Sequence, residues 1–207
     1  MLVRQWRLVR AIGVLLVLTG GTAAAQGNGR TIPTPEIFEA LEVAPGMKVC
    51  EIGAGDGELS LEAARLVGSE GRVYSSELGE ERVGTLRTNV ARSGAENVTV
   101  LEGDPDGTNL PAAACDALFM RNVYHHFGDP ASMNASLVEA LRAGARVAVV
   151  DFRPTGDEAA RPSDRDENGS HGVGAETVSR EMQAAGLQPV AERIGEGRWY
   201  MLVFAKP

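Results

Sequence analysis

The amino-acid sequence predicts an α/β fold built on a doubly wound sheet of seven strands, mostly parallel, that ends in an antiparallel hairpin. Three observations support this prediction. Apolar runs of strand length alternate with helical patterns along most of the 207 residues. A glycine-rich turn, Gly53 to Gly57, separates the first of these runs from a helical segment. The last two runs are separated only by Gly195-Glu196-Gly197, which is typical of a hairpin turn.

Each expected element follows from its apolar pattern and from the residues that bound it. A short first helix is expected at 35–41, with Thr34 as its N-cap and Pro35 at its first position. Strands are expected at 47–52, 71–76, 98–101, 116–120, 145–152, 187–194 and 199–205. Further helices are expected from the spacing of Leu59, Ala63, Leu66 and Val67, and at 80–93, 130–141 and 175–185. Asp129 and Pro130 provide a start signal, and Gly94 and Gly186 provide stop signals.

Length and composition indicate one domain preceded by a leader. With 43% hydrophobic residues, the chain can form a single substantial core, which we place at 26–207. Residues 1–25 contain three arginines and no acid, an apolar stretch at 11–18 and small residues at 22–25. This pattern predicts a cleaved signal peptide and an exported, periplasmic or secreted protein without stable membrane insertion. An uncleaved anchor and an amphipathic surface helix remain alternatives.

The net charge narrows the class of partner. A formal charge of −8 argues against a broad surface for nucleic acid, because such binding depends on Lys and Arg that neutralise phosphates. A small-molecule partner is therefore favoured over nucleic acid. The sequence contains two cysteines, Cys50 and Cys115, and so allows at most one disulfide.

The segment Val49 to Gly57 is the most informative motif. It has the pattern Glu-x-Gly-x-Gly-x-Gly, in which Glu51 lies near the end of the first expected strand. The dinucleotide fingerprint Gly-x-Gly-x-x-Gly requires a small residue where this chain has Glu58. No Gly-Lys-Ser/Thr follows, which excludes a P-loop.

With this acid and these alternating glycines, the chain from about residue 33 to residue 206 resembles the class I, Rossmann-like S-adenosylmethionine-dependent methyltransferases. The resemblance implies S-adenosylmethionine as cofactor. It places the methionine and ribose moieties along Gly53, Ala54, Gly55 and Gly57, and the methionyl amino group near Glu51. In the strand order of this family, the strands carrying Cys50 and Cys115 are parallel neighbours. We expect the two cysteines at opposite ends of these strands, unpaired, because a disulfide needs Cα atoms within about 7 Å.

Further acids support the resemblance. Glu77 ends the second expected strand, where methyltransferases and NAD enzymes alike bind the ribose hydroxyls. Asp104 follows the third strand and matches the family's acid for the adenine amino group. The resemblance also assigns to the cofactor site Leu78, Pro105, Arg121 and Asn122, although Asn122 could equally cap a turn.

The candidate chemistry lies at the ends of the fourth and fifth strands. The resemblance is closest to small-molecule methyltransferases with histidines after strand four, which implies that His125 or His126, next to Tyr124, is a general base or an orienting donor. The alternative is that one histidine packs inside and the other faces solvent. Residues 153–174 form a long polar segment that predicts a lid.

Three further residues are weaker candidates for acceptor binding. Asp151 and Arg153 could contact a polar acceptor or pair with each other at the rim, and His171 could close over the acceptor or be a solvated loop residue. We expect no metal, because adjacent histidines usually point in different directions and no His-x-x-x-His pattern is present.

The sequence as a whole predicts methyl transfer from S-adenosylmethionine to a small molecule. One alternative is an NAD(P)-dependent oxidoreductase, and another is a non-catalytic module that binds S-adenosylmethionine. Export raises a further question, because S-adenosylmethionine is made in the cytoplasm.

Overall fold

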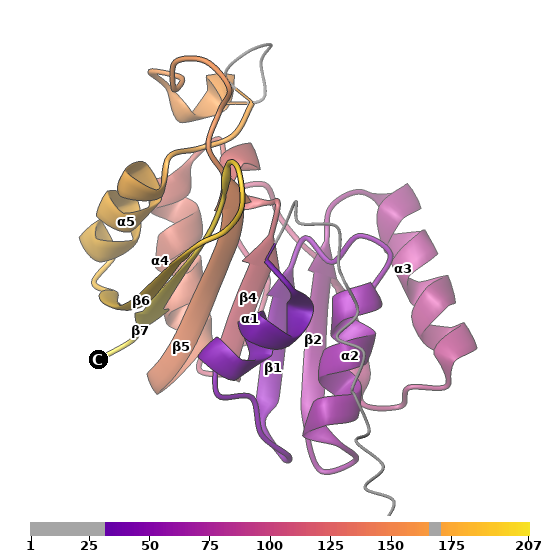
Figure 1. Cartoon of the computed structure of the whole chain (residues 1–207). Coiled ribbons are helices and arrows are strands. Elements are labelled where there is room, and N and C mark those ends of the chain that lie inside the picture. Colours follow the sequence, from indigo (N-terminus) through magenta and orange to yellow (C-terminus); the bar gives the residue numbers. More distant parts are fainter. Residues whose placement is uncertain (1–31, 166–170) are drawn as a thin grey trace, which may run out of the picture.

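The computed structural model describes residues 32–165 and 171–207, and these form one α/β unit around a single sheet (Figure 1). The strand order is β3-β2-β1-β4-β5-β7-β6. The strands are β1 Lys48–Ile52, β2 Arg72–Glu77, β3 Val98–Glu102, β4 Cys115–Arg121, β5 Leu141–Phe152, β6 Gln188–Ile194 and β7 Trp199–Ala205. The helices are α1 Thr34–Ala40, α2 Glu58–Val67, α3 Glu80–Ser93, α4 Pro130–Ala140 and α5 Ala175–Ala184, with 3₁₀ turns at Tyr124–His126 and Pro162–Asp164.

The sheet is parallel from β3 to β5 and antiparallel across β5, β7 and β6. The predicted fold class is therefore confirmed. Helices α1 and α2 cover one face of the sheet, and α4 and α5 cover the other (Figure 1). Since the parallel strands all end at the same edge, the loops after β1, β2, β3 and β4 gather there, as in other doubly wound sheets.

Some element boundaries differ from the sequence prediction. Helix α1 begins at Thr34 and its N-cap is Pro33, so Thr34 is inside the helix and does not cap it. Strand β5 begins at Leu141, because this residue leaves α4 in an extended conformation and pairs with Cys115. Leu66 was expected on the apolar side of α2, but 43% of it is exposed.

Cys50 and Cys115 form a disulfide, and the expectation of two unpaired thiols was wrong. Their Cα atoms are 5.8 Å apart, and both residues are fully buried in the core between the sheet and α4. That expectation assumed a regular strand. The β1–β4 ladder pairs Val49 with Ala117 and runs to Met120, so Cys115 lies before this ladder and its position is not set by it.

The predicted signal peptide, residues 1–25, lies outside the described residues. Within the ranges 32–165 and 171–207, no helix has the length and apolar character needed to cross a membrane.

Candidate active site

The turn after β1 has the backbone conformation that its glycines predict. Gly53, Gly55 and Gly57 have φ angles of 69°, 57° and 90°, in the left-handed region that disfavours residues with a Cβ. At Gly53 the space is also closed, since an added Cβ would lie 2.3 Å from Cγ2 of Val123. The turn therefore passes directly against the chain that follows β4.

Glu77, at the end of β2, fixes this turn. Its carboxylate accepts hydrogen bonds from the backbone N–H of Gly55 at 2.6 Å and of Leu78 at 2.8 Å. The backbone N–H of Ala54 donates to the carbonyl of Ser76 at 2.9 Å. The acid predicted to bind ribose thus also holds the glycine turn in place.

A cavity of about 640 Å³ lies at the carboxyl ends of β1, β2, β3 and β4. It brings together predicted residues from all four strand ends, namely Gly53, Glu77, Leu78, Asp104, Pro105, Arg121, Asn122 and His126. Ala54, Gly55, Gly57 and Glu51 do not line it. The lining also includes residues that sequence reasoning missed, among them Arg82, Asp106, Thr108, Val123, Phe127 and Met133. Of these, Val123 and Phe127 lie in the segment after the fourth strand that contains the predicted histidines, and Asp106 lies two residues after a predicted site acid.

The loops on either side of this cavity are shaped by local hydrogen bonds. Asn122 has a φ angle of 61°, unusual for a residue other than glycine, and its N–H donates to the carbonyl of Val150. Asp104 forms a bridge with Gly107 and accepts a hydrogen bond from the N–H of Asp106 at 3.0 Å. Backbone strain of the kind seen at Asn122 is typical of binding sites.

Glu51 lies beneath the glycine turn and not in the cavity. Its carboxylate accepts a hydrogen bond from the hydroxyl of Ser60 in α2, and the oxygen of this hydroxyl also lies 2.6 Å from the hydroxyl oxygen of Ser75. Burial raises the pKa of Glu51 to about 8, and the bond from Ser60 and the charge of Arg121 only partly oppose this shift. The predicted role of Glu51 at the methionyl amino group stays a prediction.

This raised pKa predicts how stability depends on pH. Because the folded pKa of Glu51 is about 8 and the ordinary value is 4.5, the folded protein holds a proton that the unfolded chain releases. The contribution to stability is complete below pH 4.5 and is lost as pH rises through about 8. We expect the Tm of the wild type to fall more steeply over this range than that of Glu51→Gln, measured by calorimetry. Equal slopes for the two proteins would contradict the assignment.

Tyr124 faces the helices and not the cavity. It is fully buried, and its hydroxyl donates to Glu181 at 3.0 Å and accepts from the amide of Asn134 at 2.8 Å. Burial raises the pKa of Tyr124, so its phenol stays protonated. Glu181 also pairs with the buried Arg165 at 2.6 Å, which anchors the segment before α5. The structure therefore assigns Tyr124 an anchoring contact.

Asp151 is in the interior, where it contacts His125. The Nδ1 of His125 lies 2.8 Å from one carboxylate oxygen, and both residues are buried. Asp151 consequently does not pair with Arg153 at the rim. The guanidinium of Arg153 instead lies 5.5 Å from the ring centroid of Tyr200 and 3.9 Å from Glu176.

The three histidines meet at the carboxyl end of the sheet. His171 places its Nε2 3.1 Å from Nε2 of His125. His126 is exposed and lines the cavity, and its ring centroid lies 4.0 Å from that of His125. The expectation that the adjacent histidines diverge was therefore wrong. Among the residues that the structure describes, no three His, Cys, Asp or Glu side chains form a group that could hold a metal.

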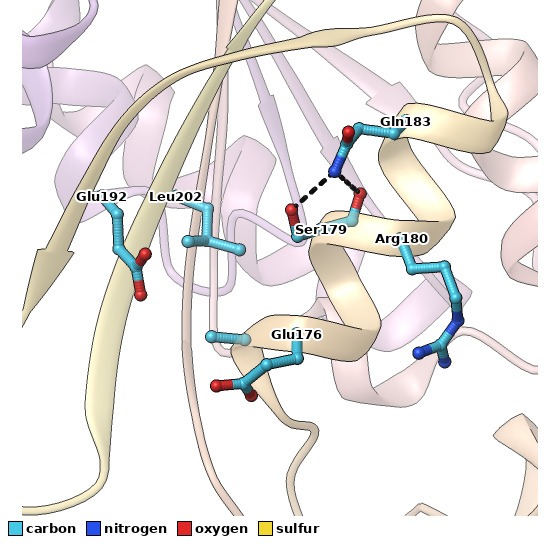
Figure 2. A pocket seen from close by; sticks show the side chains of 7 residues that line it. Glu176, Ser179, Arg180, Gln183, Glu192 and Leu202 are labelled. Atoms are coloured by element: carbon cyan, nitrogen blue, oxygen red, sulfur yellow. Dashed lines mark hydrogen bonds between the residues drawn. The ribbon is translucent and has the colours of Figure 1, made fainter.

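A second hollow, of about 470 Å³, lies between α5 and the β6–β7 hairpin (Figure 2). Its lining is polar and includes Glu176, Ser179, Arg180, Gln183 and Glu192. The amide of Gln183 is already bonded to the hydroxyl and the carbonyl of Ser179 (Figure 2). None of the predicted site residues lines this hollow, and we place the candidate site at the glycine turn.

Comparisons with known proteins agree with this placement. A family model described as a methyltransferase domain matches residues 44–200. The protein-L-isoaspartate O-methyltransferase of Ignicoccus hospitalis is 39% identical over 98 residues, which are 45% of this chain and 46% of the relative. The enzyme of the same name from Methanothermobacter thermautotrophicus is 33% identical over 112 residues, 50% of each chain. The chain thus spans about half the length of these curated relatives.

Solved structures agree on the fold. A methyltransferase structure from Aquifex aeolicus, described as S-adenosylmethionine-dependent, superposes with a TM-score of 0.71 at 22% identity, over 83% of this chain and 88% of that one. Phosphoethanolamine N-methyltransferase 2 of Haemonchus contortus, solved with S-adenosylmethionine, gives a TM-score of 0.69 at 12% identity, over 84% of this chain and 52% of that one.

Proposed function

This chain belongs to the methyltransferase domain family, and on that premise we propose that it transfers a methyl group from S-adenosylmethionine to a small-molecule acceptor. The observation that carries the proposal is the cavity of about 640 Å³ beside the glycine turn. Its lining combines the strand-end acids Glu77 and Asp104 with His126. The NAD(P)-dependent alternative is disfavoured by the family match and by Glu58 in place of a small residue.

The residues present fit this cofactor. Glu77 offers carboxylate oxygens to ribose hydroxyls, and Asp104 offers an acceptor to the amino group of adenine. Gly53 keeps the wall of the cavity as backbone alone, since any side chain there would collide with Val123. The acids and the glycine turn together suit a nucleoside with hydrogen-bond donors on both its sugar and its base.

S-adenosylmethionine supplies a methyl group already activated on a sulfonium. The protein therefore has to orient the acceptor and exclude water. His126 is the predicted catalytic residue that lines the cavity, and it can hydrogen-bond an acceptor hydroxyl. Proton removal is needed only for an acceptor that is protonated at the working pH.

The relatives suggest a second candidate acceptor. They are named for protein L-isoaspartate, so an isoaspartyl peptide is the alternative to a small molecule. The cavity of about 640 Å³ falls within the range of about 300–1,000 Å³ typical of small-molecule sites, which suits the cofactor itself and does not distinguish the two acceptors. Release of S-adenosylhomocysteine, measured with an isoaspartyl peptide and with a panel of phenols, amines and thiols, separates the two candidates.

The cofactor assignment is tested by calorimetric titration with S-adenosylhomocysteine and with NAD. We expect S-adenosylhomocysteine to bind, and Glu77→Gln to weaken binding by about tenfold or more through loss of a charged hydrogen-bond acceptor. The matched control is Glu80→Gln, an exposed residue in the first turn of α3 that makes the same charge change. Tighter binding of NAD, or an unchanged affinity in Glu77→Gln, would refute the assignment.

We also propose that the protein is exported. The buried Cys50–Cys115 disulfide supports this, because disulfides persist mainly in oxidising compartments. N-terminal sequencing of the protein from its native host tests the leader, and an intact Met1 would rule out cleavage. The exported enzyme would need a supply of S-adenosylmethionine outside the cytoplasm.

A further inference from the structure

We infer that Asp151 is a positioning residue that fixes one tautomer of His125 and, through it, the proton on His171. These three side chains, called the histidine relay below, form an ordered hydrogen-bonded chain beside the cavity. The inference rests on the proposed function, whose acceptor site it completes. It also reassigns Asp151 and His171, which the sequence offered as acceptor-binding residues.

The first step is the carboxylate of Asp151. One oxygen lies 2.8 Å from Nδ1 of His125 and also accepts the backbone N–H of Phe152 at 2.8 Å. The other oxygen accepts the backbone N–H of His125 at 3.1 Å. All three of these contacts are made by nitrogen atoms, and an ionised carboxylate can only accept hydrogen bonds from them. The hydrogen of neutral His125 therefore lies on Nδ1.

The second step is the contact between the two histidines. With its hydrogen on Nδ1, neutral His125 has a lone pair on Nε2. That atom lies 3.1 Å from Nε2 of His171, a normal distance for an N–H···N hydrogen bond. The hydrogen between them must therefore belong to His171. Asp151 thus sets the tautomers of two histidines although it contacts only one.

The third step is the position of the histidine relay relative to the cavity. The ring of His126 lines the cavity, and its centroid lies 4.0 Å from that of His125 and 6.3 Å from that of His171. Phe152 packs against His125 and His171 at 4.8 Å and 5.1 Å. The guanidinium of Arg198 lies over Phe152 at 4.8 Å, and Asp151 supplies the carboxylate of the relay through its contact with His125.

This arrangement suits an acceptor with a hydroxyl group. As the acceptor oxygen forms its bond to the methyl carbon, the bond from that carbon to sulfur breaks and sulfur keeps the electron pair. The hydroxyl proton moves to a ring nitrogen of His126, the histidine that lines the cavity, and the positive charge that it brings lies beside the His125–Asp151 pair. The products are the methyl ether and S-adenosylhomocysteine, and the proton then passes to solvent.

Nitrogen-15 NMR tests the relay without knowledge of the acceptor. The chain has three histidines, so single His→Gln variants assign all the ring signals. In the wild type, at a pH high enough for neutral rings, we expect His125 to carry its hydrogen on Nδ1 and His171 to carry its hydrogen on Nε2. In Asp151→Asn we expect His125 to lose this single-tautomer pattern and to become a mixture. Glu176→Gln, an exposed carboxylate close to Arg153, is the matched control and should leave the pattern unchanged.

Two outcomes would overturn the inference. The first is an NMR spectrum of the wild type in which neutral His125 carries its hydrogen on Nε2, and this measurement needs no variant. The other is one equivalent of a transition metal found by elemental analysis, because the facing Nε2 atoms would then be ligands. Binding of S-adenosylhomocysteine to Asp151→Asn is measured in parallel and should stay within about twofold of the wild type, since Asp151 does not line the cavity. Absence of this binding in the wild type would refute the proposed function alone.

Discussion

Replacement of Gly53 by alanine is expected to weaken the binding of S-adenosylhomocysteine by about a hundredfold, since a strained backbone alone costs about 1–3 kcal/mol. Two physical effects combine at this position. The φ angle of 69° disfavours any side chain, and the new Cβ would lie 2.3 Å from Cγ2 of Val123. Val123 and Gly53 both line the cavity, so relief of the clash must deform the wall of the site. Isothermal titration calorimetry measures the change.

Gly68→Ala is the matched control for this experiment. Gly68 has a φ angle of 68°, but an added Cβ there would meet no atom within 4 Å, and the residue caps the far end of α2. The control therefore shares a positive φ with Gly53 but lacks the clash. We expect it to lower stability by about 1–3 kcal/mol and to leave the affinity unchanged. Equal affinities for Gly53→Ala and the wild type would show that the ligand does not bind at this turn.

The sequence was sufficient to predict which strand-end residues meet at the cavity beside the glycine turn, because its signals there are local. Gly53, Gly55 and Gly57 each require positive φ, and a run of strand residues precedes both Glu77 and Asp104. In a parallel sheet the strand ends meet at one edge, so the position of each acid in its own strand is enough to bring them together. No contact between distant residues had to be known.

The acceptor side could not be predicted in this way, because it depends on contacts across the fold. Tyr124 and His125 are adjacent, yet one bonds to Glu181 in α5 and the other to Asp151 in β5. The 3₁₀ turn at Tyr124–His126 sets these directions, and no pattern in the sequence indicated it. The contact of Glu51 with Ser60, in the first turn of the next helix, was likewise not indicated by the sequence.

The disulfide was not predicted for the same reason, because it too depends on contacts between residues distant in the sequence. Regular pairing over their whole length would keep Cys50 and Cys115 apart, but the ladder between β1 and β4 begins only at Ala117, and the shift of register beside Cys115 places extra residues in β5. Such shifts arise from the pairing of strands that are distant in sequence. An apolar run by itself carries no information about them.

Reduction of the Cys50–Cys115 disulfide is expected to lower the free energy of unfolding by about 2–4 kcal/mol. The two cysteines are 65 residues apart in the sequence, so the cross-link removes a large loop-closure entropy from the unfolded chain. Both sulfurs lie in the core beside β1, the strand that leads into the glycine turn, so we expect reduction also to loosen the cofactor site. Urea denaturation with and without dithiothreitol measures the loss, and a Cys50→Ala/Cys115→Ala variant should not respond to the reductant. If dithiothreitol leaves the midpoint of the wild type unchanged although free thiols are detected after unfolding, the bridge does not stabilise the fold and its support for export is lost.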